Sequence, residues 1–147
     1  MTAAMSIEIR LLGASDTDVL ANVAPDVFDG EVDTRWTAEF LADERHHLVV
    51  ALDVTCVVGM ASAMHYVHPD KGPELWVNEV GVAGSHQGQG IGRKLVEALL
   101  AHGRALGCTE AWVLTEESNT AARQLYSRTG GVESPALMYS FQLGPPR

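Results

Sequence analysis

Features that define several classes of protein are scarce in this chain of 147 residues. It has only two cysteines, Cys56 and Cys108, and no Cys-x-x-Cys pair, which excludes a disulfide-rich scaffold and favours buried free thiols. It has no run of about 18 apolar residues, so we expect no membrane-spanning helix. Residues 1–6 lack a basic segment followed by an apolar run. We therefore expect a flexible N-terminus, no secretory signal and a cytoplasmic protein.

Basic residues are also scarce: the chain has 10 lysines and arginines and 19 aspartates and glutamates, which gives a net charge of −9. The deficit is uneven: residues 1–44 contain ten acids and two bases, whereas residues 85–147 contain five acids and six bases. An acidic chain argues against nucleic acid as a partner and favours a cationic one, although the acids could instead form a solvated surface. The six histidines have no metal-ligand spacing, so we predict no metal site.

The chain is predicted to form one domain over residues 1–147, because it contains no linker, repeat or low-complexity tract. Alternating apolar residues predict strands, and apolar residues at helical spacing predict helices, with Asp33 or Thr34 capping the second helix. We expect strands at residues 7–12, 47–52, 56–66, 75–83, 110–115 and 137–142, and helices at residues 15–24, 34–41, 91–107 and 119–129. This order predicts an α/β (α+β) fold with a mixed, mostly antiparallel sheet and helices on both faces.

The most informative segment is a glycine-rich loop at residues 87–92, Gln-Gly-Gln-Gly-Ile-Gly, between a predicted strand and a predicted helix. Glycines let the backbone approach a ligand closely, and the start of a helix favours a phosphate or pyrophosphate group. A tight strand–helix turn would also explain the glycines. Arg93 stands where a Rossmann fingerprint needs glycine, and the sequence Gly92-Arg93-Lys94-Leu95 does not match a P-loop.

Two motifs resemble one family when taken together. The loop matches Gln/Arg-x-x-Gly-x-Gly/Ala, and residues 119–130 match Asn-x-x-Ala-x-x-Leu-Tyr-x-x-x-Gly. Both motifs, in this order, resemble the GCN5-related N-acetyltransferase (GNAT) superfamily, and the similarity extends over residues 7–143. Gly131 departs from the pattern, because the family usually has Phe there. The resemblance implies a GNAT fold with splayed central strands and acetyl-CoA as the acyl donor.

The resemblance also implies which residues bind acetyl-CoA. Backbone N–H groups near Val80 are expected to bind the thioester oxygen, and Val82 to pair with the pantetheine amides. The glycine loop is expected to hold the pyrophosphate, and Asn119 to reach the cofactor arm. The residues predicted to bind the cofactor are Val80, Val82, Gln87, Gly88, Gln89, Gly90, Gly92, Arg93 and Asn119.

Two residues are predicted to be catalytic, Tyr126 and Glu79. Tyr126 occupies the motif position at which many GNAT members have the tyrosine that protonates the departing thiolate; the alternative is a core aromatic residue. Glu79 is expected on the same strand face as Leu75 and Val77, where burial would raise its pKa and make it a general base. The alternative is a structural carboxylate, and His65 or His68 is a rival base.

The predicted acceptor is a primary amine on a small polycationic molecule. Residues 66–82 resemble the same stretch of small aminoglycoside 3-N-acetyltransferases, which have an acidic residue at the position of Glu79 and an acidic cleft. Here that residue is Glu rather than Asp, and Asn78 replaces an aromatic residue. The residues predicted to bind the acceptor are Asp29, Glu31, Asp33, Asn78 and Glu79.

An aminoglycoside antibiotic is therefore the predicted substrate, which would make the protein an antibiotic-resistance enzyme. A polyamine or a peptide or protein amine stays open as the acceptor, and so does a coenzyme A-binding sensor that lacks catalysis. We also predict a homodimer, with no nucleic acid and no membrane among its partners.

Overall fold

The computed structural model describes residues 6–146 of the chain. The expectation of a flexible N-terminus falls, except for Ser6, outside the described residues. The elements in chain order are β1 (Glu8–Leu11), the 3-10 helix η1 (Ala14–Ala21), α1 (Thr34–Ala42), β2 (His46–Asp53), β3 (Cys56–His68), β4 (Lys71–Val82), the short 3-10 helix η2 (Gly84–His86), α2 (Ile91–Ala105), β5 (Glu110–Val113) and α3 (Thr120–Arg128). None of the helices between residues 6 and 146 is both long and apolar enough to cross a membrane.

The five strands form one sheet in the order β1-β2-β3-β4-β5, with every neighbouring pair antiparallel except the parallel pair β4–β5. This confirms the predicted mixed, mostly antiparallel sheet. β5 pairs with β4 only from Glu74 to Val77, whereas β4 continues to Val82. The two strands therefore separate beyond Val77, which is the splay expected of the fold.

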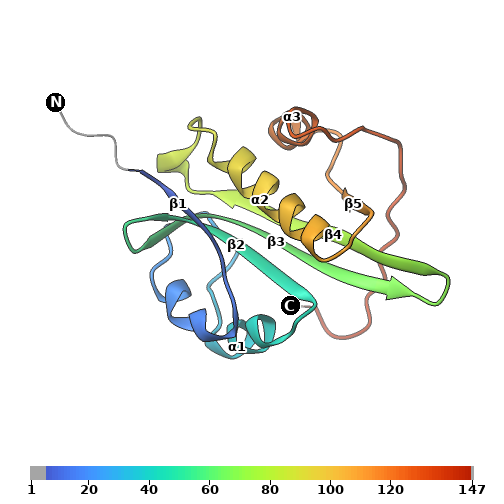
Figure 1. Cartoon of the computed structure of the whole chain (residues 1–147). Helices are drawn as coiled ribbons and strands as arrows, with labels where there is room; N and C mark the ends of the chain where they lie inside the picture. The colour runs from blue at the N-terminus through green and yellow to red at the C-terminus, as the bar shows by residue number, and fades with distance from the viewer. Residues whose placement is uncertain (1–5, 147) are drawn as a thin grey trace.

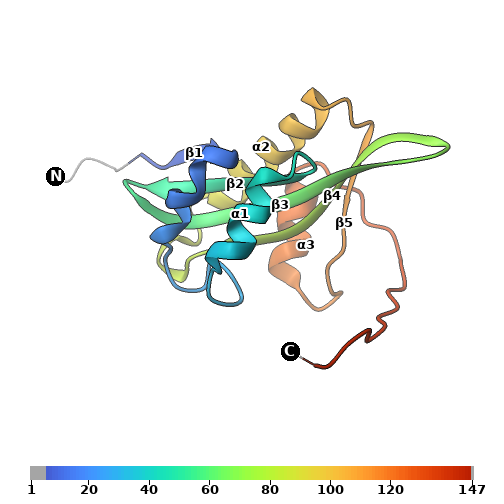
Figure 2. The same ribbon diagram turned by 90° about the horizontal axis from the view of Figure 1, so that it is seen from below.

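Helices cover both faces of the sheet, as predicted: α2 lies on one face, and α1 and η1 lie on the other (Figure 1). The inward residues Leu95, Val96 and Leu99 of α2 are between 0% and 3% exposed, because they recur at helical spacing on a single stripe. Figure 2 shows the β3–β4 hairpin projecting well beyond this layered body. The core therefore lies between the sheet and its two helical layers.

Side-chain caps are present at two predicted helix starts, of which only the one at Asp33 was predicted as a cap. The Asp33 carboxylate accepts a hydrogen bond from the Trp36 N–H at 2.9 Å, which fixes the start of α1. The Asn119 side-chain oxygen accepts one from the Ala122 N–H at 3.1 Å at the start of α3. Each cap satisfies a backbone donor that has no partner within its own helix.

A β-bulge at Asn78 changes which face the second half of β4 presents. In the register with β3, Ala63 pairs with Val77 and Ser62 pairs with Glu79, so Asn78 has no partner. Packing confirms the change of face. Leu75 packs against α2 at Gly103, and Val82 packs against α2 at Gly92, although one residue number is odd and the other even.

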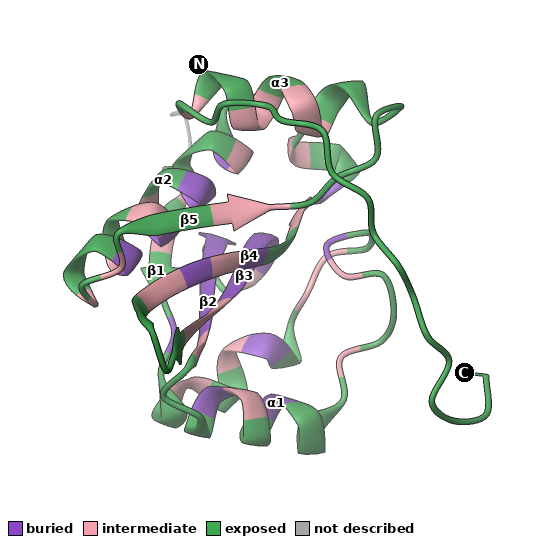
Figure 3. Ribbon diagram, turned by 90° about the vertical axis from the view of Figure 1, so that its right-hand side faces the viewer, coloured by how far each residue is buried: buried purple, intermediate pink, exposed green. Residues whose placement is uncertain are grey.

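Two element predictions are wrong. The first predicted helix is a 3-10 helix that ends at Ala21, three residues earlier than expected. The predicted closing strand at residues 137–142 is absent, because residues 131–146 follow α3 without regular secondary structure. Figure 3 shows this segment running away from the body with all of its described residues exposed. Gly131 begins it, where the family pattern has an apolar anchor.

Candidate active site

The glycine loop forms an open cradle at the start of α2. Gly88 and Gly90 have φ angles of 78° and 76°, in the left-handed region that favours glycine, and Gly90 is the N-cap of α2. A Cβ added to either glycine would meet no atom within 4 Å. The first backbone N–H groups of a helix have no partners inside the helix, so they can donate to an anion. The geometry fits a pyrophosphate group.

The loop is tied to the end of β4 and to α3. The Gln87 side-chain nitrogen donates to the Val82 carbonyl at 3.2 Å, which joins the loop to the predicted pantetheine-binding strand. A Cβ on Gly92 would lie 3.5 Å from the Leu125 side chain, so α3 packs closely against the first turn of α2. Two predicted cofactor-binding segments, the glycine loop and the last residues of β4, therefore lie together.

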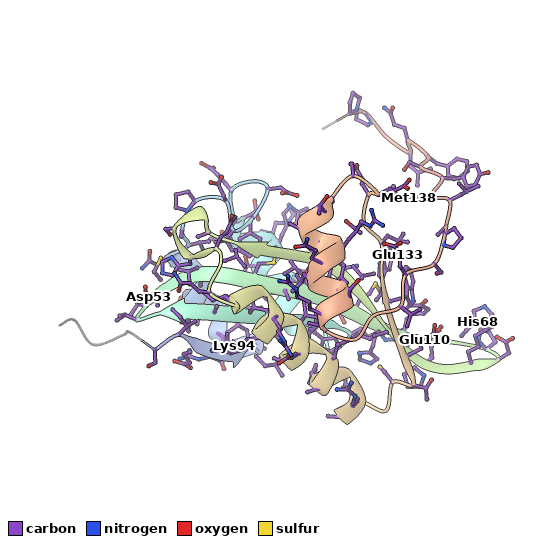
Figure 4. All side chains as sticks on the ribbon, turned by 90° about the horizontal axis from the view of Figure 1, so that it is seen from above. Asp53, His68, Lys94, Glu110, Glu133 and Met138 are labelled. Carbon is purple, nitrogen blue, oxygen red and sulfur yellow. The ribbon has the colours of Figure 1, made fainter. Side chains whose placement is uncertain are left out.

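The remaining predicted cofactor residues differ in how free their side chains are. Arg93 donates from Nε to the Glu97 carboxylate at 2.7 Å, so part of its guanidinium is engaged along α2. The side chains of Gln89 and Lys94 are exposed, and Figure 4 shows Lys94 on α2. Asn119 uses its oxygen as the α3 cap, and its amide nitrogen makes no hydrogen bond to another described residue.

Glu79 lies on the opposite face of the sheet from the one we predicted. The bulge at Asn78 turns Glu79 away from the α2 side, where Leu75 and Val77 are buried. It therefore shares its face with Gly81 but not with those two apolar residues. The residue is exposed rather than buried. Sequence reasoning missed this because a strict two-residue period cannot reveal an inserted residue.

The acidic loop between η1 and α1 packs directly against this face. Val27 is 2% exposed, and a Cβ on Gly81 would collide with the Val27 carbonyl. Glycine at position 81 thus allows the loop backbone to rest on β4. Asp29 follows Val27 by two residues, and Glu79 precedes Gly81 by two. The contact between Val27 and Gly81 therefore helps to bring the Asp29 and Glu79 carboxyl groups together.

The electrostatics of Glu79 reflect that arrangement. Although Glu79 is exposed overall, the surrounding atoms remove part of its contact with water, and this partial desolvation raises the pKa of its carboxyl above its usual value. The neighbouring Asp29 carboxyl raises that pKa further. Glu31 and Asp33 are exposed on the same loop, although Asp33 has one oxygen engaged at the α1 cap. Asp29 thus lies close enough to Glu79 to raise the pKa of its carboxyl, and Asn78 is the unpaired bulge residue that precedes Glu79.

Tyr126 is half-buried on α3, on the same side of the helix as Ala122 and Leu125. Burial raises the pKa of its phenol, so the hydroxyl keeps its proton at neutral pH. The hydroxyl makes no hydrogen bond to any residue between 6 and 146. A proton donor with a free hydroxyl is compatible with the predicted acid.

Sequence reasoning missed a tryptophan pair on the Glu79 face. Trp76 of β4 and Trp112 of β5 are register partners, and their rings stack with centroids 4.9 Å apart and an interplanar angle of 13°. Trp76 alternates with the buried Leu75 and Val77, so it lies on the side that Glu79 joins after the bulge. Both rings are partly exposed. Only a predicted strand register could have shown that they meet.

The histidines do not join this site. His47 lies between His65 and His102, with nitrogen–nitrogen distances of 2.7 Å to His65 and 3.0 Å to His102. This chain of rings lies on the α2 side of the sheet, so His65 does not reach Glu79. Among residues 6–146, no group of three or more His, Cys, Asp or Glu side chains is arranged to hold a metal ion. Figure 4 places His68 at the tip of the projecting hairpin.

A separate recess of about 410 Å³ lies on the other side of α3. It is lined by residues of α3 and by Glu133 of the segment that follows. The Arg123 guanidinium donates to the Glu133 carboxylate at 2.7 Å and closes one side of the recess. Tyr126 faces away from it, so this recess does not belong to the candidate active site.

Residues 17–131 match a family model described as the acetyltransferase (GNAT) family. The chain belongs to the GNAT family. The family recognition based on the two motifs is therefore confirmed, and the fold agrees with it.

Solved structures with the same fold include aminoglycoside acetyltransferases. One is meta-AAC0020 from an uncultured soil metagenomic sample, with a TM-score of 0.82 at 20% identity, covering 94% of this chain and 97% of that one. The aminoglycoside N-acetyltransferase AAC(6')-Iy in complex with CoA has a TM-score of 0.78 at 19% identity, covering 97% of this chain and 99% of that one. At these identities the likeness shows the fold.

Shorter stretches of higher identity are shared with two mycothiol acetyltransferases. The protein from Geodermatophilus obscurus is 49% identical over 69 residues, which cover 44% of this chain and 22% of that protein. The protein from Saccharopolyspora erythraea is 45% identical over 62 residues, which cover 42% of this chain and 20% of that protein. The aligned stretches thus span about a fifth of the length of these relatives.

Proposed function

We propose that this protein is an acetyl-CoA-dependent N-acetyltransferase that acts on a primary amine of a small polycationic molecule, with an aminoglycoside as the predicted acceptor. The observation that carries the proposal is the pairing of Glu79 with Asp29 on the open face of β4, beside the splay. Two carboxyl groups close together favour a cation between them. The family supplies the acetyl donor, and these residues supply the acceptor site.

The proposed donor site runs from the end of β4 to the start of α2. Acetyl-CoA would supply the activated acetyl group as a thioester. The N–H groups of the glycine loop would hold its pyrophosphate, and the backbone near Val80 would hold the thioester oxygen. Gln87 supports this arrangement because it fixes the loop to Val82. A splay between two strands leaves backbone groups of β4 free for this purpose.

The proposed chemistry uses one base and one acid. Glu79 would take the proton that the acceptor ammonium must lose before its nitrogen can attack the thioester carbon. Tyr126 would give a proton to the sulfur as the carbon–sulfur bond breaks. The raised pKa of Glu79 brings its carboxyl closer to the pH at which a base exchanges protons efficiently. The raised pKa of Tyr126 keeps its proton available.

The acceptor face suits a molecule with several positive charges. Asp29, Glu31 and Asp33 offer carboxylates to further ammonium groups, which need such partners when they leave water. The ring surfaces of Trp76 and Trp112 that the stack leaves exposed attract cations through their ring electrons. Selectivity would then come from the spacing of the charges rather than from a closed pocket.

A panel of amines, assayed with acetyl-CoA by following the release of free thiol, tests the proposal. The panel contains a 2-deoxystreptamine aminoglycoside such as gentamicin, a linear polyamine, a basic peptide and the acceptor of the mycothiol acetyltransferases. We expect turnover to be fastest with the aminoglycoside. Turnover of peptides or polyamines alone would overturn the antibiotic assignment and leave the N-acetyltransferase assignment intact.

The same panel separates the alternatives. The acceptor of the mycothiol acetyltransferases is included because the chain shares local stretches of 49% and 45% identity with two proteins of that name. Tight binding of acetyl-CoA without turnover of any amine would favour a coenzyme A-binding sensor.

The proposal also includes a homodimer in the cytoplasm.

A further inference from the structure

A contact between a histidine and a carboxylate lies immediately before the glycine loop. His86 is the last residue of η2, and the loop begins at the next residue, Gln87. The Nε2 atom of the His86 ring lies 2.8 Å from a carboxylate oxygen of Asp53. The two side chains are only 20% and 28% exposed, so the contact is largely shielded from water. It joins the entrance of the loop to a distant part of the sheet.

Asp53 lies at a tight turn between two strands of the sheet. It is the last residue of β2 and pairs with Cys56, the first residue of β3, across a two-residue turn. Val54 in this turn has a φ of 56°, which a β-branched residue keeps only where the surrounding structure holds it. Figure 4 shows Asp53 at the end of the sheet where the chain enters α2. The turn therefore provides a fixed anchor for a group on η2.

The hydrogen-bond roles of the His86 ring follow from its two partners. A carboxylate can only accept, so a neutral His86 carries its proton on Nε2 and donates it to Asp53. The Nδ1 atom is then an acceptor, and the Ser85 hydroxyl donates to it at 2.7 Å. A hydrogen bond to an ionised acceptor is stronger than one between neutral groups. The bond to Asp53 is therefore the stronger of the two that hold the ring.

The short helix η2 is held at both of its ends. Before its first residue, the Ala83 N–H donates to the Val58 carbonyl of β3 at 2.8 Å. At its last residue, the His86 N–H donates to the Ala83 carbonyl at 2.9 Å, and the His86 ring reaches Asp53. The backbone that leads into the glycine loop is therefore attached to β3 on one side and to the β2–β3 turn on the other.

The glycine loop needs such support because its own residues do little to fix its shape. A Cβ added to Gly88 or Gly90 would meet no atom within 4 Å. Gln87 contributes one exposed hydrogen bond to the Val82 carbonyl, at the longer distance of 3.2 Å. Glycine loses more conformational freedom than any other residue when its backbone is fixed. A loop of this composition binds a ligand tightly only when neighbouring contacts hold it in its binding conformation beforehand.

We propose that Asp53 and His86 are positioning residues for acetyl-CoA, because their hydrogen bond holds the glycine loop in the conformation that binds the pyrophosphate. Neither side chain has to touch the cofactor. Loss of the bond lowers the fraction of molecules whose loop is ready to bind, and the apparent affinity falls by the same factor. The role in cofactor binding rests on the proposed function, whereas the effect of the bond on the loop does not.

Two amide side chains at position 86 separate this bond from the rest of the ring. The amide nitrogen of glutamine reaches about as far as Nε2, so His86→Gln can still donate to Asp53. The amide nitrogen of the shorter asparagine lies near the position of Nδ1, so His86→Asn cannot. Asp53→Ala removes the acceptor instead. His68→Asn and Asp70→Ala are the controls, because they break a second histidine–carboxylate contact, at the tip of the projecting hairpin.

Two measurements on the full chain follow these variants. Calorimetry gives the affinity for acetyl-CoA, and NMR order parameters of Gly88 and Gly90, recorded without cofactor, show how firmly the loop is held. We expect His86→Asn and Asp53→Ala each to weaken binding roughly tenfold, which corresponds to a loop that is ready to bind about a tenth of the time. In both variants the order parameters should fall towards about 0.6, a value typical of flexible backbone.

The remaining variants show whether the bond itself is responsible. His86→Gln should change the affinity less than about threefold, and the hairpin controls should match the unsubstituted protein. The double variant of Asp53→Ala and His86→Asn should bind no more than about twofold more weakly than either single variant, because both remove the same contact. Asp53→Ala alone provides the test if His86→Asn does not fold.

Three results would overturn the inference. Equal losses with His86→Asn and His86→Gln would assign the effect to the ring rather than to its bond with Asp53. Losses that add fully in the double variant would show that the two residues act separately. Normal affinity in Asp53→Ala, while Gly90→Glu abolishes binding, would show that the loop needs no such anchor. Normal affinity in Gly90→Glu would refute the pyrophosphate site itself, and with it the role in cofactor binding, even if the order parameters fall as expected.

Discussion

The Tyr126 hydroxyl is the group whose removal tests the acid directly. Tyr126→Phe keeps the ring, which packs beside Leu125 on α3, and removes only the proton. We expect kcat to fall by roughly ten- to a thousandfold while acetyl-CoA affinity, measured by calorimetry, stays the same. Tyr139→Phe is the matched control because it removes a hydroxyl from the exposed segment that follows α3. An unchanged kcat at all pH values would make Tyr126 a packing residue.

Glu79 is tested through its pH dependence. Its pKa is raised, so its carboxylate form, the base, is lost as the pH falls through that raised value. Glu79→Gln should lower kcat/KM and remove this acidic limb from the pH–rate profile. Glu74→Gln, on the same strand, is the control and should keep it. If the Glu79 variant retained the acidic limb, the base would have to be another group.

At the scale of elements, the glycine loop at the start of α2 is the predicted pyrophosphate site. A glycine after the end of α2 provides a matched control position for testing it. Gly90 and Gly107 flank this helix, with φ angles of 76° and 86°, and a Cβ on either meets nothing within 4 Å. Glutamate at either position therefore brings the same backbone strain and the same charge. We expect Gly90→Glu to abolish acetyl-CoA binding in calorimetry and Gly107→Glu to leave it nearly unchanged. Normal affinity in a folded Gly90→Glu variant would exclude the loop as the pyrophosphate site.

The three histidines His65, His47 and His102, which connect β3, β2 and α2, should make the stability of the fold sensitive to acid. Burial, together with the neighbouring His102, His65 and His46, lowers the pKa of His47 from 6.5 to about 4. The folded state therefore favours neutral His47. Its contribution is complete above pH 6.5 and is lost as the pH falls from 6.5 towards 4.

The loss over that window should be on the order of 2–3 kcal/mol of unfolding free energy. Urea unfolding at pH 7 and at pH 4.5 measures it. His47→Gln should be less stable at pH 7 but should show a shallower decline towards acid. His68→Gln, in the exposed hairpin turn, should follow the unsubstituted protein. A decline of equal slope in the His47 variant would exclude this histidine as its source.

Sequence periodicity predicted most of the helices and strands. It missed the features of the site that depend on how the strands are paired residue by residue. Strands at the positions of β2 and β3 and the helix α2 follow from alternation and helical spacing, and Asp33 correctly marks the start of α1. The face of Glu79 and the meeting of Trp76 with Trp112 depend on an unpaired residue and on a partner strand. Neither is encoded in the local pattern that periodicity measures.

At the scale of the whole molecule, charge should govern how the acceptor binds. The triple variant Asp29→Asn, Glu31→Gln and Asp33→Asn removes three charges, and an asparagine in place of Asp33 can still cap α1. We expect KM for a polycationic amine to rise more than kcat falls, and the salt dependence of KM to weaken. Replacing Asp16, Asp18 and Glu39 with the corresponding amides is the control. Equal effects in both variants would indicate only a general effect of net charge.

Residues 131–146 show why a strand-like local pattern is not sufficient to form a strand. Residues 137–142 have the alternation that we used to predict the strand, yet they lie in no sheet of this structure. A strand needs a partner edge as well as a suitable pattern.

The bulge at Asn78 separates the alternation seen in the sequence of β4 from the faces that the strand presents. Before it, odd-numbered residues pack under α2; after it, even-numbered residues do. Because Asn78 is the extra residue, deleting it would leave Val77 opposite Ala63 and Glu79 opposite Ser62, and every later side chain would keep its face. Straightening the strand with Asn78 still in place would instead turn Glu79 and Gly81 towards α2. Related sequences are therefore free to lack this one position and still keep the carboxylate on the same face.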